Sequence, residues 1–360
     1  MKFFNIDCHI SVIADVNNIF KSLGHEVFDL SVSGHASLMN KQKMTIKLNS
    51  GYLIDGCNSI TRKIGKDFYE TFKEKLSIYD GFICCYPTEF CMLYELFNKP
   101  IIIVNCIRYE HPYTRFKENW DELNDCIKEL YNKNLLYWIC NNKGDLEYSK
   151  YYTNIIGTWI PSLCEYTNTK YNPKYNKYII SNRTNLTPQC LNNNAINLSS
   201  ITRNGSWFSW DEKSKYKGII HIPYHNGSMS IFEEYTSNIP LFVPSKTFGK
   251  ELFHKKIMFN DLTFYRYFDI QEPIDIDSPN SLRNYTILNM WFDTCDFYDE
   301  ENMPYVYYFD SIEHLNLLLN TLTIDDLKIT SKKMEEFNKK RKEYVYDKWK
   351  KILIIINDKI

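Results

Sequence analysis

Short apolar runs rich in β-branched residues alternate with amphipathic stretches along the first half of this chain. The apolar runs occupy 2–6, 26–30, 81–86, 101–106 and 135–140, and the helical patterns occupy 12–23, 62–78, 88–97, 115–131 and 145–154. Wholly apolar runs fit strands that are buried on both faces, and parallel strands need a crossover helix between them. The order therefore predicts an α/β fold with a doubly wound parallel sheet.

A second α/β pattern starts at residue 178 and is clearest in GIIHIPYHNGSMSIFEEYTSNIPLFVPS, residues 218–245. A buried strand over 218–223 leads into a polar turn, and a helix follows over 229–235 with Ser228 or Ser230 as its N-cap. The residue before Pro240 is pushed out of the helical region, so the helix ends there and a strand follows. A turn that joins a strand to a helix N-terminus offers backbone N–H groups, which predicts a site for a nucleotide diphosphate.

The same stretch resembles the donor-binding segment of the GT-B glycosyltransferases. In that family a strand ends in a proline-containing loop, a helix carries a glutamate, and a Gly-Ile-Pro-like break precedes another strand. Glu233 takes the place of the helix glutamate here, and Asn-Ile-Pro at 238–240 takes the place of the break. Many retaining members carry a second glutamate eight positions earlier, where this chain has His225. The phrase LGHEV at 23–27 resembles the first βαβ unit of the family.

The resemblance implies two Rossmann-like doubly wound domains that face each other across a cleft. It also implies transfer of a sugar from a nucleotide-sugar donor to a hydroxyl acceptor on a glycan or a protein-linked glycan. We expect an N-terminal acceptor-binding domain over 1–165, a linker over 166–177, a C-terminal donor-binding domain over 178–331 and a C-terminal helix over 332–360. In the family such a helix packs back on the N-terminal domain, and Trp349, Ile352 and Ile355 form a suitable face. The alternative is a solvated terminal helix.

The resemblance also implies which residues bind the donor. Arg183 lies in the first turn of the second domain, where the family commonly supplies a basic residue to the donor phosphates. Glu233 is expected to bind the ribose hydroxyls, with Glu234 facing solvent or a neighbouring helix. The turn and the start of the helix are expected to contact the diphosphate or the sugar: His225, Asn226, Gly227, Ser228, Met229 and Ser230. The alternatives are a surface pair of glutamates and a turn histidine with no role.

Polar residues beyond the strands of the first domain are the acceptor-side candidates. His9 follows the first strand, where a GT-B domain can present a catalytic base, and Asp7 is expected to orient its other ring nitrogen. Glu89 follows the third strand and is counted with the catalytic residues. Arg108 and Glu110 follow the next strand, which indicates either acceptor recognition or a local ion pair. A purely structural histidine is the alternative for His9.

Composition narrows the partners and the compartment. The chain has 360 residues and a formal net charge of −1, so no global field favours nucleic acid or an anionic membrane. Its 11 cysteines form no CxxC pair, which predicts buried thiols in a reducing compartment. The sequence shows neither a signal-peptide pattern nor an apolar segment long enough for a membrane span. We therefore expect a cytosolic protein that binds a nucleotide sugar and a glycan, with no nucleic acid and no membrane span.

The donor pattern calls for no metal and no other cofactor, because helix dipoles and basic side chains can neutralise a diphosphate leaving group. An Asp-X-Asp triplet at 275–277 lies in an acidic loop rather than at a strand end. The bias toward Asn, Ile, Lys and Tyr suggests an AT-rich genome, such as that of a large DNA virus or a protist. Two further functions fit this fold: a GT-B-type nucleotide-sugar epimerase, and a non-catalytic sugar-binding scaffold for which the replacement at His225 is the motivating feature.

Overall fold

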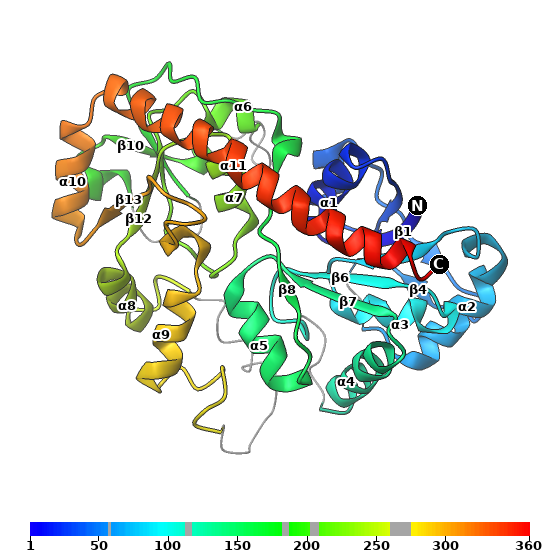
Figure 1. Cartoon of the computed structure of the whole chain (residues 1–360). Coiled ribbons are helices and arrows are strands. Elements are labelled where there is room, and N and C mark those ends of the chain that lie inside the picture. The colour runs from blue at the N-terminus through cyan, green and yellow to red at the C-terminus, as the bar shows by residue number, and fades with distance from the viewer. Residues whose placement is uncertain (57–58, 112–116, 182–186, 202–208, 260–274) are drawn as a thin grey trace. The chain divides into compact units, whose positions relative to one another are not determined.

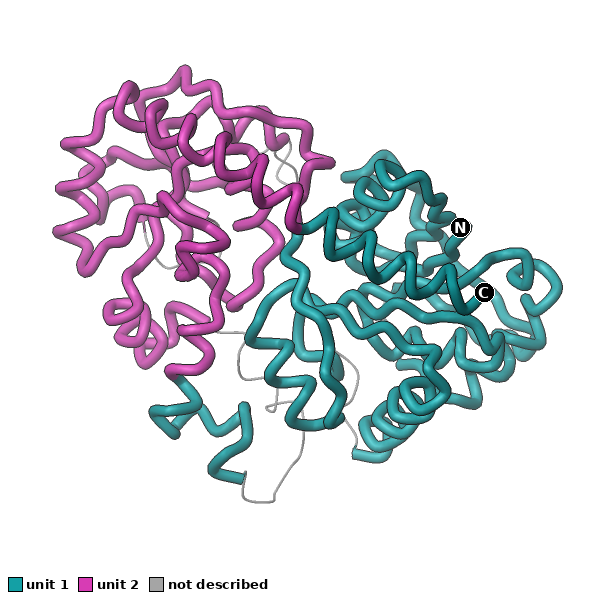
Figure 2. The backbone as a smooth tube through the Cα atoms, in the orientation of Figure 1, with its two compact units in different colours: residues 1–162, 264–288, 345–360 teal, residues 163–263, 289–344 magenta. Residues whose placement is uncertain are grey.

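A computed structural model describes residues 1–56, 59–111, 117–181, 187–201, 209–259 and 275–360 (Figure 1). The chain divides into two compact units (Figure 2). Unit 1 comprises residues 1–162, 264–288 and 345–360, and unit 2 comprises residues 163–263 and 289–344, in each case as far as they are described.

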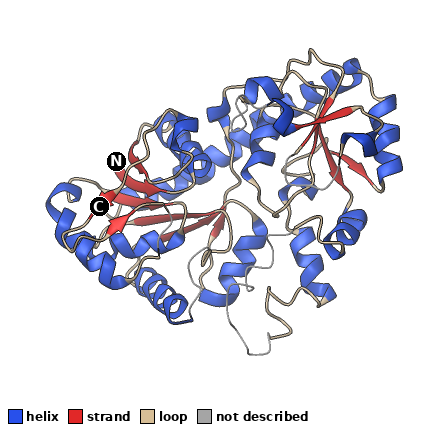
Figure 3. Cartoon of the chain, turned by 180° about the vertical axis from the view of Figure 1, so that it is seen from behind, coloured by secondary structure: helices blue, strands red, loops and turns tan. Residues whose placement is uncertain are grey.

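Unit 1 is built on a parallel sheet with the strand order β2-β1-β5-β6-β7-β8 (Figure 3). Its central strands are buried along nearly their whole length, which explains why their sequences are largely apolar. A separate antiparallel pair, β3 and β4, forms a short hairpin between β2 and α2. The bounds are β1 Lys2–Asp7, α1 Ile10–Ser22, β2 Glu26–Ser31, β3 Ile46–Lys47, β4 Leu53–Ile54, α2 Arg62–Leu76, β5 Gly81–Cys84, α3 Cys91–Tyr94, β6 Ile101–Asn105, α4 Lys117–Asn132, β7 Leu136–Cys140, α5 Lys143–Thr153 and β8 Thr158–Trp159.

Unit 2 has a second parallel sheet, in the order β10-β9-β11-β12-β13. The two sheets have the same kind of topology. In each, the first strand lies inside the sheet, and the chain adds strands first on one side of it and then on the other. The prediction of two Rossmann-like doubly wound units is confirmed. The bounds are β9 Tyr178–Ile180, β10 Ala195–Asn197, α6 Trp210–Lys213, β11 Ile219–Ile220, α7 Met229–Thr236, β12 Leu241–Pro244, α8 Lys246–His254, α9 Tyr285–Asp293, β13 Tyr307–Phe309, α10 Ile312–Thr321 and α11 Ile324–Asn357.

A glycine beside the corresponding strand of each unit allows the same close packing. A Cβ on Gly81 would lie 2.8 Å from the carbonyl oxygen of Pro100, and a Cβ on Gly218 would lie 2.8 Å from that of Pro240. Each proline comes just before the next strand of its sheet. Only glycine permits this approach without moving the neighbouring backbone, so the two sheets solve one packing problem in the same way.

Helix α11 begins eight residues before the predicted start at 332. Thr323 and Asp326 cap it reciprocally: the Asp326 amide donates to the Thr323 hydroxyl at 3.2 Å, and the Thr323 amide donates to the Asp326 carboxylate at 3.0 Å. From residue 345 onward the helix belongs to unit 1, where the ring of Trp349 meets that of Phe20 at a centroid distance of 5.2 Å. Ile355, expected on the same packed face, is half exposed.

Two stretches fall in other units than the sequence suggested. Residues 166–177, the expected linker, belong to unit 2, where the Asn172 amide donates to the carbonyl of Ser214 at 3.0 Å. The stretch shows no helical or strand periodicity because its backbone is irregular, and backbone hydrogen bonds such as this one hold it in place. Residues 275–288, expected in the C-terminal domain, group with unit 1, and Tyr152 and Ser278 share a hydrogen bond of 2.7 Å between their hydroxyls.

Candidate functional site

The neighbouring strands β1 and β5 form the switch point of unit 1, the place at whose carboxyl edge doubly wound sheets bind ligands. The amide of Cys8 donates to the carbonyl of Tyr86 at 3.0 Å. His9 is the N-cap residue of α1, and its ring meets the Tyr86 ring edge-on at 5.9 Å between centroids. The Tyr86 hydroxyl and Nδ1 of His111 share a hydrogen bond of 2.8 Å. Residues that follow three different strands are therefore brought together here.

Asp7 lies at this edge but does not orient His9. It ends β1 opposite Ser31 of β2 and is fully buried. Burial raises the pKa of Asp7 to about 6, and the charge of Lys41, followed by the nearby Ser31 hydroxyl, opposes that rise. Neither carboxyl oxygen of Asp7 has a hydrogen-bond partner among the described residues, so the predicted base–orienter pair is wrong. His9 has already left the sheet to begin a helix.

Glu89 and Glu110 are buried carboxyl groups that influence each other. Burial, followed by the negative charge of Glu110, raises the pKa of Glu89 from 4.5 to about 9. Burial also raises the pKa of Glu110 to about 7, and the largest opposing influence is a hydrogen bond from Tyr148. A carboxyl group with a pKa near 9 keeps its proton at neutral pH, so Glu89 is a hydrogen-bond donor there rather than a base.

Arg108 forms the local ion pair that the sequence left as one of two possibilities. Its Nη1 donates to Oδ1 of Asp145 at 3.2 Å, and both side chains are fully buried. Asp145 lies in the first turn of α5, where Nδ2 of the N-cap Asn142 donates to its Oδ2 at 2.7 Å. The Arg108 guanidinium also lies over the ring of Tyr148, 5.7 Å from its centroid. The sequence analysis missed Asp145 and Asn142, although the N-x-x-D spelling of a capped helix start was visible.

In unit 2 the switch point lies between β9 and β11. The amide of Ser181, just after β9, donates to the carbonyl of Ile220 at 3.1 Å, so the ends of the two strands are joined. Arg183, the predicted phosphate ligand, lies outside the described residues. Strand β11 covers Ile219–Ile220 and is shorter than the predicted strand over 218–223.

The turn that follows β11 is buried, contrary to the expectation of an open anion site. Asn226 is 0% exposed, His225 2% and Ser228 3%. The Gly227 amide donates to Nδ1 of His225 at 3.1 Å, so that ring nitrogen carries no proton and one amide of the turn is already bonded. Ser228 is the N-cap residue of α7, but its hydroxyl pairs with that of Ser230 at 2.8 Å and does not cap the helix.

Glu233 lies on α7, where Met229, also predicted to bind the donor, packs into the core. Both carboxylate oxygens of Glu233 accept hydrogen bonds within unit 2. The hydroxyl of Tyr166 donates to Oε1, and the indole N–H of Trp210 donates to Oε2 at 2.9 Å. The carboxylate is thus held in one orientation by two aromatic donors that the sequence analysis did not single out.

Glu234, the next residue, is buried as well and does not face solvent. Its Oε1 lies 2.8 Å from Nζ of Lys213, and its Oε2 lies 3.0 Å from Nδ1 of His221. Burial favours the protonated form of Glu234, but the charge of Lys213, followed by that of His221, holds its pKa at about 2. The adjacent glutamates of α7 are therefore both bound by α6, one through Trp210 and the other through Lys213.

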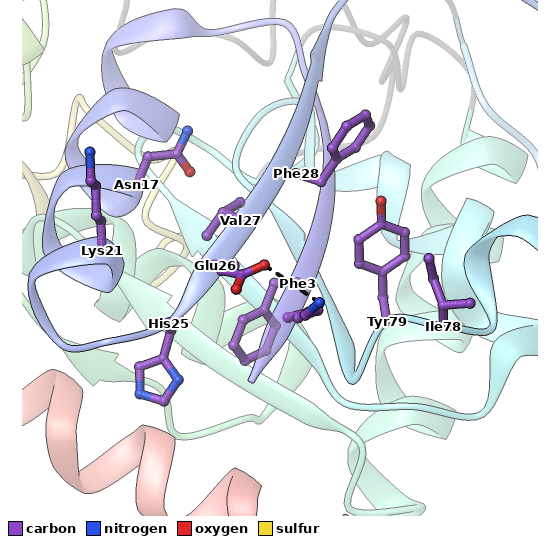
Figure 4. Close-up of a pocket in the computed structure, with 10 residues that line it drawn as sticks. Phe3, Asn17, Lys21, His25, Glu26, Val27, Phe28, Ile78 and Tyr79 are labelled. Carbon is purple, nitrogen blue, oxygen red and sulfur yellow. Dashed lines mark ion pairs between the residues drawn. The ribbon is translucent and has the colours of Figure 1, made fainter.

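A cavity of about 510 Å³ lies elsewhere in unit 1 (Figure 4). Residues at the amino-terminal ends of β1 and β2 line it together with Asn17 and Lys21 of α1, and an ion pair of 3.7 Å joins Lys2 to Glu26 beside it. Parallel strands present their carboxyl ends at the opposite edge of the sheet, so this cavity contains none of the predicted site residues.

Cys8 is disulfide-bonded, which differs from the expectation of free thiols throughout. The other described cysteines are free, and all of them except Cys190 are buried. Within the described ranges, no group of three or more His, Cys, Asp or Glu side chains is arranged to hold a metal ion. No helix in the part of the chain that the structure describes is both long and apolar enough to cross a membrane.

Neither a family model nor a curated protein matches this chain. Among solved structures, the glycosyltransferase SnogD from Streptomyces nogalater is 9% identical over 94% of each chain, with a TM-score of 0.43. The spinosyn rhamnosyltransferase SpnG complexed with thymidine diphosphate is 8% identical over 94% of this chain and 96% of its own, with a TM-score of 0.40. SsfS6, a glycosyltransferase of Streptomyces sp. SF2575, is 10% identical over 89% of this chain and 100% of its own, at 0.38. Because these scores are below 0.5, the fold assignment made here depends on the sheets of this chain itself.

Proposed function

We propose that this protein is a glycosyltransferase that moves a sugar from a nucleotide-sugar donor to a hydroxyl acceptor. The observation that carries the proposal is that the candidate residues follow strands of two doubly wound sheets. His9, Glu89 and Glu110 follow strands of unit 1, and Glu233 follows the switch-point strand of unit 2. Ligands of this fold class bind at that edge, and the unit 2 residues are those that resemble the GT-B donor segment.

In this proposal unit 2 binds the donor. Glu233, held by Tyr166 and Trp210, accepts hydrogen bonds from the ribose hydroxyls with its remaining lone pairs. Arg183 and the residues from His225 to Ser230 bind the diphosphate. Unit 1 binds a hydroxylated acceptor such as a glycan near Arg108 and Glu110, and His9 is the candidate base. No metal or nucleic acid takes part.

A second candidate function is a non-catalytic sugar-binding scaffold. Burial of the turn at His225 and Asn226 favours it, because buried amides are not offered to a diphosphate as the structure stands. The two candidates differ in one measurable way, since only the transferase turns over a nucleotide sugar.

The test is thermal unfolding of the full chain with uridine, thymidine, guanosine and adenosine diphosphates, followed by single-turnover assays with the corresponding nucleotide sugars. We expect at least one diphosphate to raise the unfolding temperature, because a ligand that binds only the folded state stabilises it. Glu233→Gln should weaken that nucleotide about tenfold or more, the loss expected when a charged hydrogen-bond acceptor is removed.

Glu251→Gln, an exposed glutamate on α8, is the matched control and should leave nucleotide affinity unchanged. Failure of every diphosphate to shift unfolding, together with no turnover of any donor, would refute the transferase and favour the scaffold. Turnover without an acceptor, giving an isomeric nucleotide sugar, would identify an epimerase. A cytosolic location and a viral source stay predictions, which fractionation of the native host and sequencing of the surrounding genome would decide.

A further inference from the structure

Glu110 is the inner end of a chain of buried hydrogen bonds in unit 1. The Tyr148 hydroxyl donates to its Oε1, and Nδ2 of Asn280 donates to the Tyr148 oxygen at 3.2 Å. The same Nδ2 donates to the Tyr152 hydroxyl at 2.9 Å. Glu110, Tyr148 and Asn280 are all buried, although Asn280 lies 132 residues from Tyr148 in the sequence. Donors arranged in series strengthen one another, so Asn280 makes the Tyr148 hydroxyl a better donor to a carboxylate.

Glu89 is the second carboxyl group of this cluster and is only 1% exposed. The backbone of Ile60 donates to it, but its Oε2 has no hydrogen-bond partner among the described residues. An unpaired carboxylate oxygen is costly to bury, whereas a protonated carboxyl group can donate that hydrogen to a ligand. Two neighbouring carboxyl groups in a buried site do not both ionise readily, so one of the two keeps its proton. Tyr148 favours the charged form of Glu110 and thereby leaves the proton on Glu89.

We propose that Glu110 is the proton acceptor of unit 1, that Tyr148 and Asn280 are its positioning residues, and that Glu89 is a protonated carboxyl group that donates a hydrogen bond to the ligand. The catalytic meaning of this assignment rests on the proposed glycosyl transfer. The geometry favours Glu110 because an orienting chain of two residues holds its carboxyl group. The ligand class is a neutral, hydroxylated acceptor, since an anion would be repelled by the Glu110 carboxylate.

The acceptor oxygen bonds to the anomeric carbon of the donor sugar while the bond from that carbon to the diphosphate oxygen breaks. The electron pair of the broken bond leaves with the nucleoside diphosphate, and the acceptor proton passes to the Glu110 carboxylate. Glu110 releases that proton to water before the next turnover, so no oxidant, reductant or further reactant is needed.

Several other ionisable groups act on these two carboxyl groups and set the background for any titration. Asp145 opposes ionisation of Glu110, and Arg108 favours it. Among the described residues, the ionisable groups that interact electrostatically with Glu110 are Glu89, Arg108, Tyr109, Asp145, Tyr148 and Tyr152. Those that interact with Glu89 are Glu110, Cys84 and Cys91. Apart from Glu89, Glu110 and Tyr148, all of these groups are unchanged in the variants described below.

The first experiment titrates the full chain with ¹³Cδ-labelled glutamate, observed by NMR and assigned with Glu89→Gln and Glu110→Gln. Tyr148→Phe should raise the pKa of Glu110 by about one to two pH units, the equivalent of one hydrogen bond to a charged acceptor. Asn280→Ala should raise it in the same direction by less, and it keeps the test intact if Tyr148→Phe does not fold. Glu110→Gln should lower the pKa of Glu89 by removing a nearby negative charge.

Tyr151→Phe is the matched control, because Tyr151 lies on the same helix but donates to the exposed Asp275 at 2.7 Å. It should leave both glutamates unchanged. An unshifted Glu110 in Tyr148→Phe and Asn280→Ala, or a Glu89 that is ionised at neutral pH, would overturn the assignment whatever the reaction is. This titration needs no substrate, so its failure is distinguishable from failure of the proposed function.

The second experiment follows the rate of sugar transfer with pH once a donor has been found. The acidic limb of the profile should move upward with the pKa of Glu110 in Tyr148→Phe, and Glu110→Gln should abolish the limb together with most of kcat. His9→Gln should leave the limb in place. A limb that disappears with His9→Gln and survives Glu110→Gln would assign the proton transfer to His9 and overturn the proposal.

Discussion

The two units have the same sheet topology, but each holds a buried glutamate, Glu89 in unit 1 and Glu234 in unit 2, and the two are in opposite charge states. In unit 1, burial raises the pKa values of Glu89 and Glu110 to about 9 and about 7, and the negative charge of Glu110 adds to the rise at Glu89. In unit 2, Lys213 and His221 surround Glu234, and the pKa of that carboxyl group is about 2. Equal burial therefore leads to a neutral acid in one unit and a fixed anion in the other.

The neighbouring charges, rather than the depth of burial, therefore decide whether a buried carboxyl group is ionised. A cation placed against Glu234 compensates the lost hydration, so its charge can only act structurally. No cation among the described residues offsets the burial of Glu89, which keeps a proton that can be exchanged. A titratable centre suits chemistry, whereas a fully paired anion suits the positioning of α7.

The variant with the greatest predicted loss of stability removes the cation that pairs with Glu234. Lys213→Ala leaves Glu234 buried beside a single partner, and we expect it to lower the free energy of unfolding by about 3 to 5 kcal/mol. Chemical denaturation followed by fluorescence measures the loss. Lys215→Ala removes a nearby lysine whose carboxylate partners, Asp211 and Glu212, lie at the surface, and it should change stability little. Equal losses in both variants would show that Glu234 does not depend on its cation.

The pH dependence of stability should also distinguish the units. For Glu234 the folded pKa lies below the ordinary value of 4.5, so its contribution is present above that value and is lost as the pH falls toward about 2. For Glu89 the folded pKa is raised from 4.5 to about 9, so the folded state binds the extra proton and stability falls as the pH rises through that window.

Glu89→Gln sharpens this point because it removes the titrating group at nearly constant shape. Between about pH 6 and pH 8, Glu89 alone should lower the free energy of unfolding of wild type by roughly 1.4 kcal/mol for each pH unit. The variant should lose that slope and be more stable than wild type at the alkaline end. Denaturation curves at several pH values measure it, and parallel curves for the two proteins would contradict a protonated Glu89.

A smaller loss of stability is predicted when one of the two hydrogen bonds to the Glu233 carboxylate is removed. Trp210→Phe keeps an aromatic ring against Tyr166 but removes the indole N–H from Oε2, and we expect a loss of about 1 to 2 kcal/mol in the free energy of unfolding. Under the proposed function the same variant should also weaken nucleotide binding. Tyr166→Phe removes the donor to the other oxygen and serves as the companion measurement, with an effect of similar size. No change in either variant would mean that Glu233 does not need these donors.

Much of the fold was predictable because it depends on local patterns. The apolar strands were predicted from the sequence. The structure adds a local cap of the kind that a sequence can show: the Ser311 hydroxyl accepts from the amide of His314 at the start of α10. The start of α11 at residue 324 could also have been predicted, because Thr323 and Asp326 have the spacing of a reciprocal helix cap. The path of residues 275–288 could not, because no local signal shows which unit an irregular segment joins.

The order of strands and helices could be read from local sequence patterns, and this order decides which residues follow which strand at the edge of each sheet. Hydrophobic periodicity is a local property, so it survives without knowledge of the fold. Only the tertiary structure decided the partners of those residues: Asp145 for Arg108, Tyr148 and Asn280 for Glu110, and Lys213 for Glu234. These partners lie far apart along the chain, and ionisation depends on what surrounds a group in space, which no spacing in the sequence encodes.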